Sequence, residues 1–319
     1  MEIRGSTWAT MERMRKLAAL LAFAIISGCN RAPEPPQTPQ TKAAPVDPYH
    51  AEIEKFRHDR EVKLTSDTGW LAIAGLSFLT KGDTTFGSDA ASDIVLPAGA
   101  PAHAGTFVLA KNGKVSVTPE TGVTYQLLDG KPFSGGPIKS DGDGAPDRLV
   151  FGDVQVWVHQ SGERPAVRIR DKNHALRKEF TGMKWYPVNE AYRIEGTFVP
   201  YDKPKEVKIP NMLGDIDTMT SPGHVTFMLN GKEHSMAVVT ENDTEFWFIF
   251  RDQTSGDETY PAARFLYTPR PVNGKVTLDF NRAENPPCAF TTYATCPLPP
   301  QENRLQVRVE AGEKIYARH

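Results

Sequence analysis

Short runs of alternating apolar and polar residues recur from residue 81 to the C-terminus, and tight-turn sequences separate them. Such runs flank Asn112-Gly113, Asp129-Gly130, Asn230-Gly231 and Asn273-Gly274. An Asn-Gly or Asp-Gly pair between two alternating runs predicts a β-hairpin. The 25 glycines and 26 prolines among 319 residues fit the same turn-rich architecture. We therefore predict a mainly β protein with two β-sandwich or barrel-like blocks, at residues 81–170 and 171–319.

A short N-terminal helix and an apolar segment are expected just before the first block, in residues 49–80. Ile53 and Phe56 recur at a spacing of three, and Asp47-Pro48 supplies a helix N-cap followed by proline in the first turn. Residues 70–79 are apolar and contain Gly75. Their periodicity fits either a buried strand or a short helix.

Residues 1–28 have the pattern of a secretory signal peptide. Arg13, Arg15 and Lys16 precede the apolar run 17–26, which is too short to cross a bilayer as a helix. The sequence Ile26-Ser27-Gly28-Cys29 resembles the cleavage box of bacterial lipoproteins. The resemblance implies that Cys29 becomes the first residue and carries a diacylglycerol plus an amide-linked acyl chain such as palmitate. An ordinary signal peptide with a chance cysteine is the alternative.

The residue after Cys29 bears on the final location. It is Asn30 and not the aspartate that, in enteric-type bacteria, resembles an inner-membrane retention signal. We therefore expect delivery to the inner leaflet of the outer membrane, with the folded part facing the periplasm. The start codon stays open among Met1, Met11 and Met14.

Residues 29–48 are expected to form a tether. They are rich in proline, which favours an extended polyproline conformation; a proline-rich partner motif is the alternative. Removal of residues 1–28 takes away four basic and two acidic residues, so the formal net charge changes from −2 to −4. This charge argues against a nucleic-acid binder. It also means that the acyl chains on Cys29 must provide the membrane attachment.

A polar, proline-rich signature occupies the C-terminal part of the chain. Its segments are residues 250–256, 260–265, 278–290, 293–300, 303–305 and 311–314. Together they resemble an uncharacterised bacterial and archaeal family known as domain of unknown function 1684, over about residues 60–316. The family has no known activity, so the resemblance assigns no role to any residue.

The first block has a second resemblance. Phe86-Gly87-Ser88, residues 92–96, His103-Ala104-Gly105 and residues 149–153 resemble pieces of a forkhead-associated sandwich. In that family an arginine after the first glycine helps to grip phosphothreonine, whereas Ser88 stands there in this chain. The resemblance therefore implies shape and no phosphate site.

Polar residues of the signature are the candidate site. Asp279 ends a predicted strand, and loops held by a rigid sheet are common places for sites. Arg264 precedes apolar residues, which indicates a buried guanidinium that needs a carboxylate partner, either Asp279 or Glu313. A structural ion pair, a clamp for a ligand anion or sugar hydroxyls, and an acid/base pair all remain open. The candidate ligand-binding residues are Arg264, Asp279, Asn281, Arg282, Asn303 and Glu313.

Cys288 and Cys296 are the only cysteines left once Cys29 is lipidated. In an oxidising periplasm, an even pair indicates a disulfide. Two reduced buried thiols, a zinc site, or a nucleophilic cysteine assisted by His224 or His234 are the alternatives.

Two loops offer several oxygen donors. Residues 252–258 and 141–144 could bind calcium, but neither matches the twelve-residue helix-loop-helix pattern, and solvated turns explain both. His159 and His174 are scattered, and no Gly-x-Ser-x-Gly elbow or phosphate-cradling loop occurs in the sequence. We therefore expect no cofactor and no metal.

Three hypotheses for the function follow. The first is a membrane-anchored periplasmic lipoprotein that binds a small polar ligand or an envelope partner. The second is a periplasmic hydrolase that uses Asp279 or Glu313, which requires two carboxylates about 5–10 Å apart in a cleft. The third is a purely structural envelope protein. The sequence leaves open whether the protein is an enzyme and what its oligomeric state is.

Overall fold

The computed structural model describes residues 47–80, 82–240 and 242–316. The predicted signal peptide, Cys29 and the tether up to residue 46 lie outside these residues. No helix in the described part of the chain is both long enough and apolar enough to span a membrane. The prediction of a mainly β protein with a short N-terminal helix is confirmed.

Helix α1 (Pro48–Thr65) begins where the sequence predicts. The Asp47 carboxylate accepts a hydrogen bond from the Tyr49 backbone N–H at 3.0 Å, and Pro48 occupies the first turn. Ile53 and Leu64 are buried. A single turn of helix, η1 (Trp70–Ala72), then leads into β1 (Ile73–Phe78), so the ambiguous apolar segment forms both structures.

The first block consists of two sheets over one core. The six-stranded sheet has the order β1-β11-β10-β9-β6-β7, and the five-stranded sheet has the order β3-β2-β4-β5-β8. Phe86 and Phe107 of one sheet share the core with Phe151 of the other. Because β1 pairs with β11, this block begins before the predicted boundary at residue 81. The strand bounds are β2 (Asp83–Gly87), β3 (Ile94–Val95), β4 (Gly105–Leu109), β5 (Val115–Pro119), β6 (Tyr125–Leu127), β7 (Pro132–Phe133), β8 (Gly136–Pro137), β9 (Leu149–Phe151), β10 (Val154–Ser161) and β11 (Arg164–Asp171).

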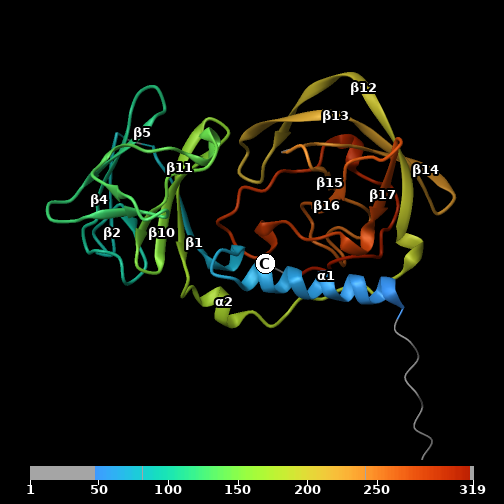
Figure 1. The fold of residues 1–319 in the computed structure, drawn as a ribbon, viewed down its shortest axis with the longest axis horizontal. Helices are drawn as coiled ribbons and strands as arrows, with labels where there is room; N and C mark the ends of the chain where they lie inside the picture. Colours follow the sequence, from blue (N-terminus) through green and yellow to red (C-terminus); the bar gives the residue numbers. More distant parts are fainter. Residues whose placement is uncertain (1–46, 81, 241, 317–319) are drawn as a thin grey trace, which may run out of the picture. The chain divides into compact units, whose positions relative to one another are not determined.

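The second block contains a four-stranded sheet, β14-β13-β12-β17, and a two-stranded sheet, β15-β16. Figure 1 shows the long hairpin of β12 (Arg193–Pro210) and β13 (Ile216–Leu229). In this region the sequence alone predicts two separate short strands, at residues 192–200 and 207–209, because Pro204 and Pro210 bracket the second. Instead, one strand continues through the prolines, because a register shift between Pro200 and Lys205 accommodates them. The other strands are β14 (Lys232–Ala237), β15 (Glu245–Phe250), β16 (Arg264–Pro269) and β17 (Lys275–Asp279).

Short helical turns and irregular segments complete the described chain. The sequence pattern of residues 306–310 predicts a closing strand, but none forms there, although this segment is hydrogen-bonded to Asp252 and Gln253. Residues 287–305 carry the disulfide loop and include two of the turns. The remaining helices are α2 (Ala175–Glu179), η2 (Asp141–Asp143), η3 (Glu190–Tyr192), η4 (Phe280–Arg282), η5 (Pro287–Ala289) and η6 (Gln301–Asn303).

Polar contacts join the end of β10 to the β12–β13 turn. Asn211 donates to the Ser161 hydroxyl at 3.0 Å, and Ser161 donates to Asp215 at 2.7 Å. Arg164 also donates to both oxygens of Asp215. Ser161 and Asn211 are buried. Directional hydrogen bonds and an ion pair therefore hold the first block to the second.

Candidate functional site

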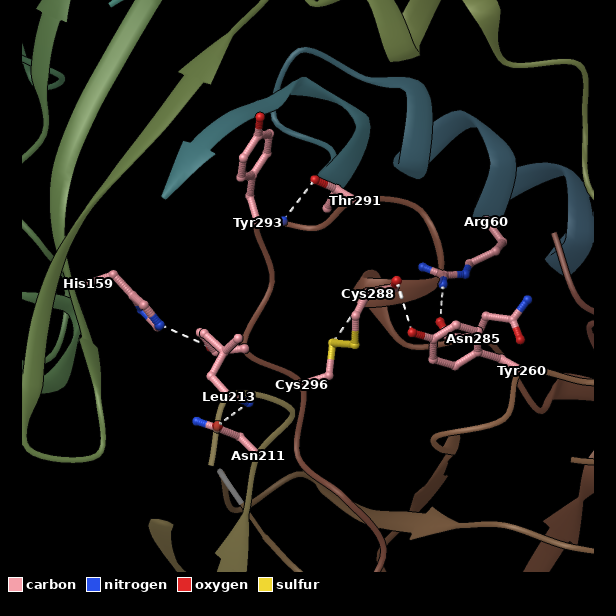
Figure 2. The surroundings of a disulfide bond; sticks show 11 residues. Arg60, His159, Asn211, Leu213, Tyr260, Asn285, Cys288, Thr291, Tyr293 and Cys296 are labelled. Atoms are coloured by element: carbon pink, nitrogen blue, oxygen red, sulfur yellow. Dashed lines mark hydrogen bonds between the residues drawn. A yellow bond between two sulfur atoms is a disulfide. The ribbon is translucent and has the colours of Figure 1, made fainter. Parts of the chain in front are cut away.

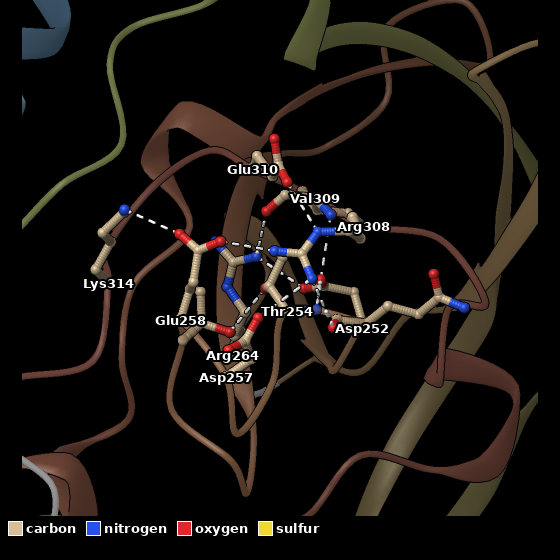
Figure 3. Close-up of polar contacts among 11 residues, drawn as sticks. Asp252, Thr254, Asp257, Glu258, Arg264, Arg308, Val309, Glu310 and Lys314 are labelled. Carbon is tan, nitrogen blue, oxygen red and sulfur yellow. Dashed lines mark hydrogen bonds and ion pairs between the residues drawn. The ribbon is translucent and has the colours of Figure 1, made fainter.

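Arg264 is fully buried in a closed network (Figure 3). Its Nη1 donates to Asp252 at 2.8 Å and to the Val309 carbonyl at 2.9 Å, and Nη2 donates to the Ala311 carbonyl. The partner of Arg264 is thus Asp252, and the expectation of Asp279 or Glu313 is wrong. Asp252 lies two residues beyond β15, a position for which the sequence gives no pairing signal. Because this network leaves no room for a ligand, the structure favours the structural interpretation of Arg264.

Asp279, Asn281 and Arg282 are brought together at the start of α1. Asp279 accepts hydrogen bonds from the Tyr49 hydroxyl at 2.9 Å and from Arg282 Nε at 3.3 Å. Asn281 is buried and donates to Asp279 at 3.1 Å. Burial and the neighbouring Asp279 carboxylate raise the pKa of Tyr49. Asp279 and Arg282 also border a hollow of about 360 Å³.

Glu313 lies in another network, with Arg60 of α1. Arg60 Nε lies 2.9 Å from Glu313 and 3.2 Å from Glu284, so two carboxylates share one guanidinium. Burial raises the pKa of Glu313 to about 7. The attraction of Arg60 offsets only part of the cost of burying the charged carboxylate, and Glu284 adds repulsion. Burial likewise raises the pKa of Glu284. Asp279 and Glu313 are therefore held by different partners, and this geometry does not favour their use as one acid/base pair.

Asn303 serves as a backbone clamp. Its side chain donates to the carbonyls of Ala237 and Ile249 and accepts from the Ala237 N–H. Because all of these partners are backbone groups of the chain and Asn303 is 1% exposed, the side chain has no surface to offer a ligand.

Cys288 and Cys296 form a disulfide with a Cα–Cα distance of 6.2 Å (Figure 2). The Tyr260 hydroxyl donates to the Cys288 carbonyl at 3.1 Å, and Arg60 donates to the nearby Asn285 carbonyl at 3.0 Å. Thr295 directly precedes Cys296, so the disulfide anchors the loop segment that carries Thr295. His159 of β10 points toward this loop in Figure 2.

Carboxylates of both oxygen-rich loops pair with groups of the chain itself. In the loop 141–144, Asp141 pairs with His159 and Asp143 pairs with Lys114. Asp257 and Glu258 pair with Arg308, and Glu258 also pairs with Lys314. Among the described residues, one group has metal-ligand spacing, Asp47, His50 and Glu190. Asp47 and Glu190 are exposed, and Asp47 already caps α1. Neither arrangement indicates a metal site.

A cavity of about 690 Å³ lies where the first block, α1 and the disulfide loop meet. Its volume is in the range typical of small-molecule sites. We call it the junction cavity. Its aromatic wall consists of Phe56, Trp70, Trp247, Phe265 and Tyr267, and its polar wall consists of Arg60, Lys63, His159, Arg168, Glu245, Glu284 and Thr295.

Arg168 of β11 lies in the polar wall with few polar partners for its guanidinium. It is 6% exposed, its nearest ion-pair partner is Asp141 at 3.9 Å, and its Nε and Nη2 atoms have no hydrogen-bond partner among the described residues. Burial lowers the pKa of Arg168 to about 10, and Asp141 compensates only in part. The guanidinium therefore lacks the acceptors and the negative charge that a buried arginine normally has.

Two further arginines add to this positive charge. Arg148 and Arg170 lie over the Trp157 ring at 4.7 and 5.1 Å. Burial and repulsion from Arg148 and Arg168 lower the pKa of Arg170 to about 10. We call Arg148, Arg168 and Arg170 the arginine cluster. Together with Asp141 they line a hollow of about 220 Å³, and Arg168 and Trp70 border both this hollow and the junction cavity.

Sequence reasoning did not identify the arginine cluster. Arg168 and Arg170 lie two apart on β11, and Arg148 lies just before β9. The only available signal was the presence of two arginines in an otherwise buried alternating strand. Equally, nothing in the sequence connected Asp141, His159 and Thr295, which come from three separate segments.

The comparisons with known proteins agree with the family predicted from the C-terminal signature. Residues 178–314 match the model of the family described as Protein of unknown function (DUF1684). The match covers less of the chain than the resemblance at residues 60–316 suggested. No curated protein matches the chain. A solution NMR structure of an uncharacterized protein from Haloarcula marismortui is 28% identical, covers 45% of this chain and 81% of its own, and has a TM-score of 0.39.

Proposed function

We propose that this protein binds a small organic anion in the junction cavity, with the anionic group on Arg168. The two guanidinium nitrogens without partners carry this proposal. A buried polar donor without an acceptor costs free energy, and a buried charge costs more. A carboxylate or a similar anion would supply the missing acceptors and charge, and charge-assisted bonds to arginine are among the strongest in proteins.

The rest of the cavity supports a ligand with an apolar or aromatic part. Trp70, Trp247 and Phe265 provide apolar surface beside Arg168. The indole Nε1 of Trp247 is buried and has no acceptor among the described residues. A ligand that combines an anionic group with a flat apolar part could place the anionic group on the polar wall and pack the apolar part against the aromatic wall.

The cellular setting remains part of the proposal. The pattern of residues 13–29 supports a lipoprotein anchored through Cys29 in the periplasm. The Cys288–Cys296 disulfide supports an oxidising compartment. Mass spectrometry of the protein from membranes should find an N-terminal peptide that begins at an acylated Cys29. A soluble, unacylated form that retains residues 1–28 would contradict this setting.

A thermal-shift titration tests the binding proposal. Hydrocinnamate carries a carboxylate and a phenyl ring, and hydrocinnamide is the matched neutral compound. Hydrocinnamate should raise Tm, because a ligand at a hundred times its Kd stabilises by about 2.7 kcal/mol. The amide should have a much smaller effect.

Two variants make this test specific. Arg168→Met should lose the shift, whereas the exposed Arg304→Gln should keep it. Equal shifts with acid and amide, or a full shift in Arg168→Met, would contradict the proposed site. If neither hydrocinnamate nor other organic anions, sugars or peptidoglycan fragments changed Tm, the structural hypothesis would be favoured.

A further inference from the structure

We propose that Thr295, His159 and Asp141 form a nucleophile–base–carboxylate triad that hydrolyses esters of small organic anions in the junction cavity. This inference rests on the proposed function, because it places the ester group of the bound anion beside Thr295. His159 Nε2 lies 3.0 Å from Thr295 Oγ1, and His159 Nδ1 lies 2.7 Å from Asp141 Oδ2. These distances match those of a hydroxyl nucleophile, a general base and the group that orients the base.

The hydrogen bonds around Asp141 fix the direction of proton transfer. Asp141 Oδ1 accepts from the Gln160 N–H at 2.8 Å, which sets the orientation of the carboxylate. Burial would raise the pKa of Asp141, but the hydrogen bond and charge of His159 outweigh it and hold the pKa below its usual range. An ionised carboxylate only accepts, so His159 Nδ1 carries the proton. In the neutral imidazole, which is the form that acts as a base, Nε2 carries no proton and accepts the hydrogen bond from the Thr295 hydroxyl.

The position of the triad distinguishes it from an ordinary core network. His159 and Thr295 both line the junction cavity, together with Arg168. They come from β10 and from the disulfide loop, and Asp141 comes from η2. An ester whose anionic end lies on Arg168 can therefore reach the Thr295 hydroxyl within the same cavity. Arg168 and Trp247 have N–H groups without partners in this cavity. These groups can donate to the carboxylate of the ester and to the carbonyl oxygen that becomes negative during the reaction.

The reaction balances without a cofactor. Thr295 Oγ1 attacks the carbonyl carbon of the ester, its proton moves to His159 Nε2, and the carbonyl electron pair moves to the oxygen. Collapse of the tetrahedral intermediate re-forms the carbonyl and breaks the bond to the alcohol, which takes the proton from His159. Water then attacks the acyl carbon of the acyl–Thr295 ester and gives its proton to His159. The bond between the acyl carbon and Thr295 Oγ1 breaks, Oγ1 takes the proton back from His159, and the acid is released. Asp141 stabilises the imidazolium and acts as a positioning residue.

The alternative is that the same three residues form only a latch between the first block and the disulfide loop. Mono-p-nitrophenyl glutarate is a suitable probe because it is an activated ester with a free carboxylate, and p-nitrophenyl butyrate is its neutral counterpart. The wild type should release p-nitrophenol from the anionic ester with a kcat/KM at least tenfold higher than from the neutral one. Intact mass spectrometry of quenched samples should show one added glutaryl group. Peptide mapping of the same samples should place this group on a peptide that contains Thr295.

Variants separate catalysis from the latch. Thr295→Val should lose acylation and reduce kcat at least 100-fold, whereas Thr295→Ser should retain both. Asp141→Asn should reduce kcat at least 100-fold and shift the pH–rate profile, because it stabilises the wrong His159 tautomer. Asp141→Asn and Thr295→Ser keep the assay decisive if Thr295→Val does not fold.

The outcomes also separate this inference from the proposed binding function. If glutarate and hydrocinnamate stabilise the wild type but the ester is neither hydrolysed nor transferred to Thr295, the catalytic inference is overturned and the binding function stands. Hydrolysis at the wild-type rate by a folded Thr295→Val variant would overturn the inference as well. If neither binding nor hydrolysis occurs, both fail together.

Discussion

Arg264 and Arg168 are both buried arginines on β-strands of the same chain, but their surroundings differ. Arg264 binds Asp252 and two backbone carbonyls, and only its Nε lacks a partner. Arg168 has one carboxylate at 3.9 Å and two nitrogens without partners, and it borders a cavity. The first arginine has its counter-ion and most of its hydrogen-bond acceptors in its own chain, and it stabilises the fold. The second is suited to a partner that the chain does not provide.

The largest expected effect is the loss of the satisfied arginine. Arg264→Met should destabilise the protein by about 3–5 kcal/mol, because it leaves Asp252 as a buried carboxylate without its counter-ion. Urea unfolding measures the difference. Asp252→Asn combined with Arg264→Met should recover part of the loss, since the buried charge is then absent. A loss below about 1 kcal/mol for the single variant would contradict the structural role of this pair.

The next effect concerns the loop that closes the junction cavity. Replacement of Cys288 and Cys296 by alanine should cost about 2–3 kcal/mol, because the disulfide constrains a short loop in the unfolded chain. Since Thr295 adjoins Cys296, hydrocinnamate binding should weaken as well. Unfolding in the presence and absence of hydrocinnamate measures both changes. Unchanged ligand stabilisation in this double variant would show that the cavity does not depend on the loop.

A third effect is pH-dependent and involves Arg60, Glu284 and Glu313. The pKa of Glu313 is raised to about 7, whereas an unfolded glutamate titrates near about 4.3. The folded state therefore binds more protons between these values. This contribution to stability is complete below about pH 4.3 and is lost as the pH rises through 7, with a slope of at most about 1.4 kcal/mol per pH unit.

Chemical unfolding at several pH values tests this titration. Glu284→Gln removes the competing carboxylate, so Glu313 can pair fully with Arg60 and the decline between pH 5 and 7 should flatten. An equally steep decline in Glu284→Gln would show that Glu284 does not perturb Glu313.

The smallest effect on stability is expected for the unsatisfied arginine. Arg168→Met should change the free energy of unfolding by about 1 kcal/mol or less in the absence of ligand, because it removes a buried charge that has few partners. Arg264→Met provides the matched comparison in the same urea series. A loss as large as that of Arg264→Met would mean that Arg168 is structural too.

Local patterns in the sequence were sufficient for much of the fold. Asp47-Pro48 placed the start of α1, and Asn230-Gly231 placed the β13–β14 turn, where both residues have positive φ angles of 52° and 73°. Such turns need specific residues at adjacent positions, so the sequence carries their signal directly. Prolines misled the prediction of β12, because a register shift in a long hairpin is set by its partner strand.

The candidate site depended on contacts between distant residues and was less predictable. The apolar neighbours of Arg264 in the sequence were enough to predict that it needs a carboxylate partner. Which carboxylate this is, Asp252, depends on the loop that packs against β16. Thr295 lies 136 residues from His159 in sequence. No periodicity or motif connects such residues, because only the packing of the two blocks brings them together.

A crystal structure of the protein with hydrocinnamate tests the central claim most directly. We predict that the carboxylate lies within hydrogen-bond distance of Arg168 Nε or Nη2 and that the phenyl ring lies against the aromatic wall of the junction cavity. A structure at saturating hydrocinnamate in which the ligand lies elsewhere, or in which other groups of the protein occupy both nitrogens of Arg168, would contradict it.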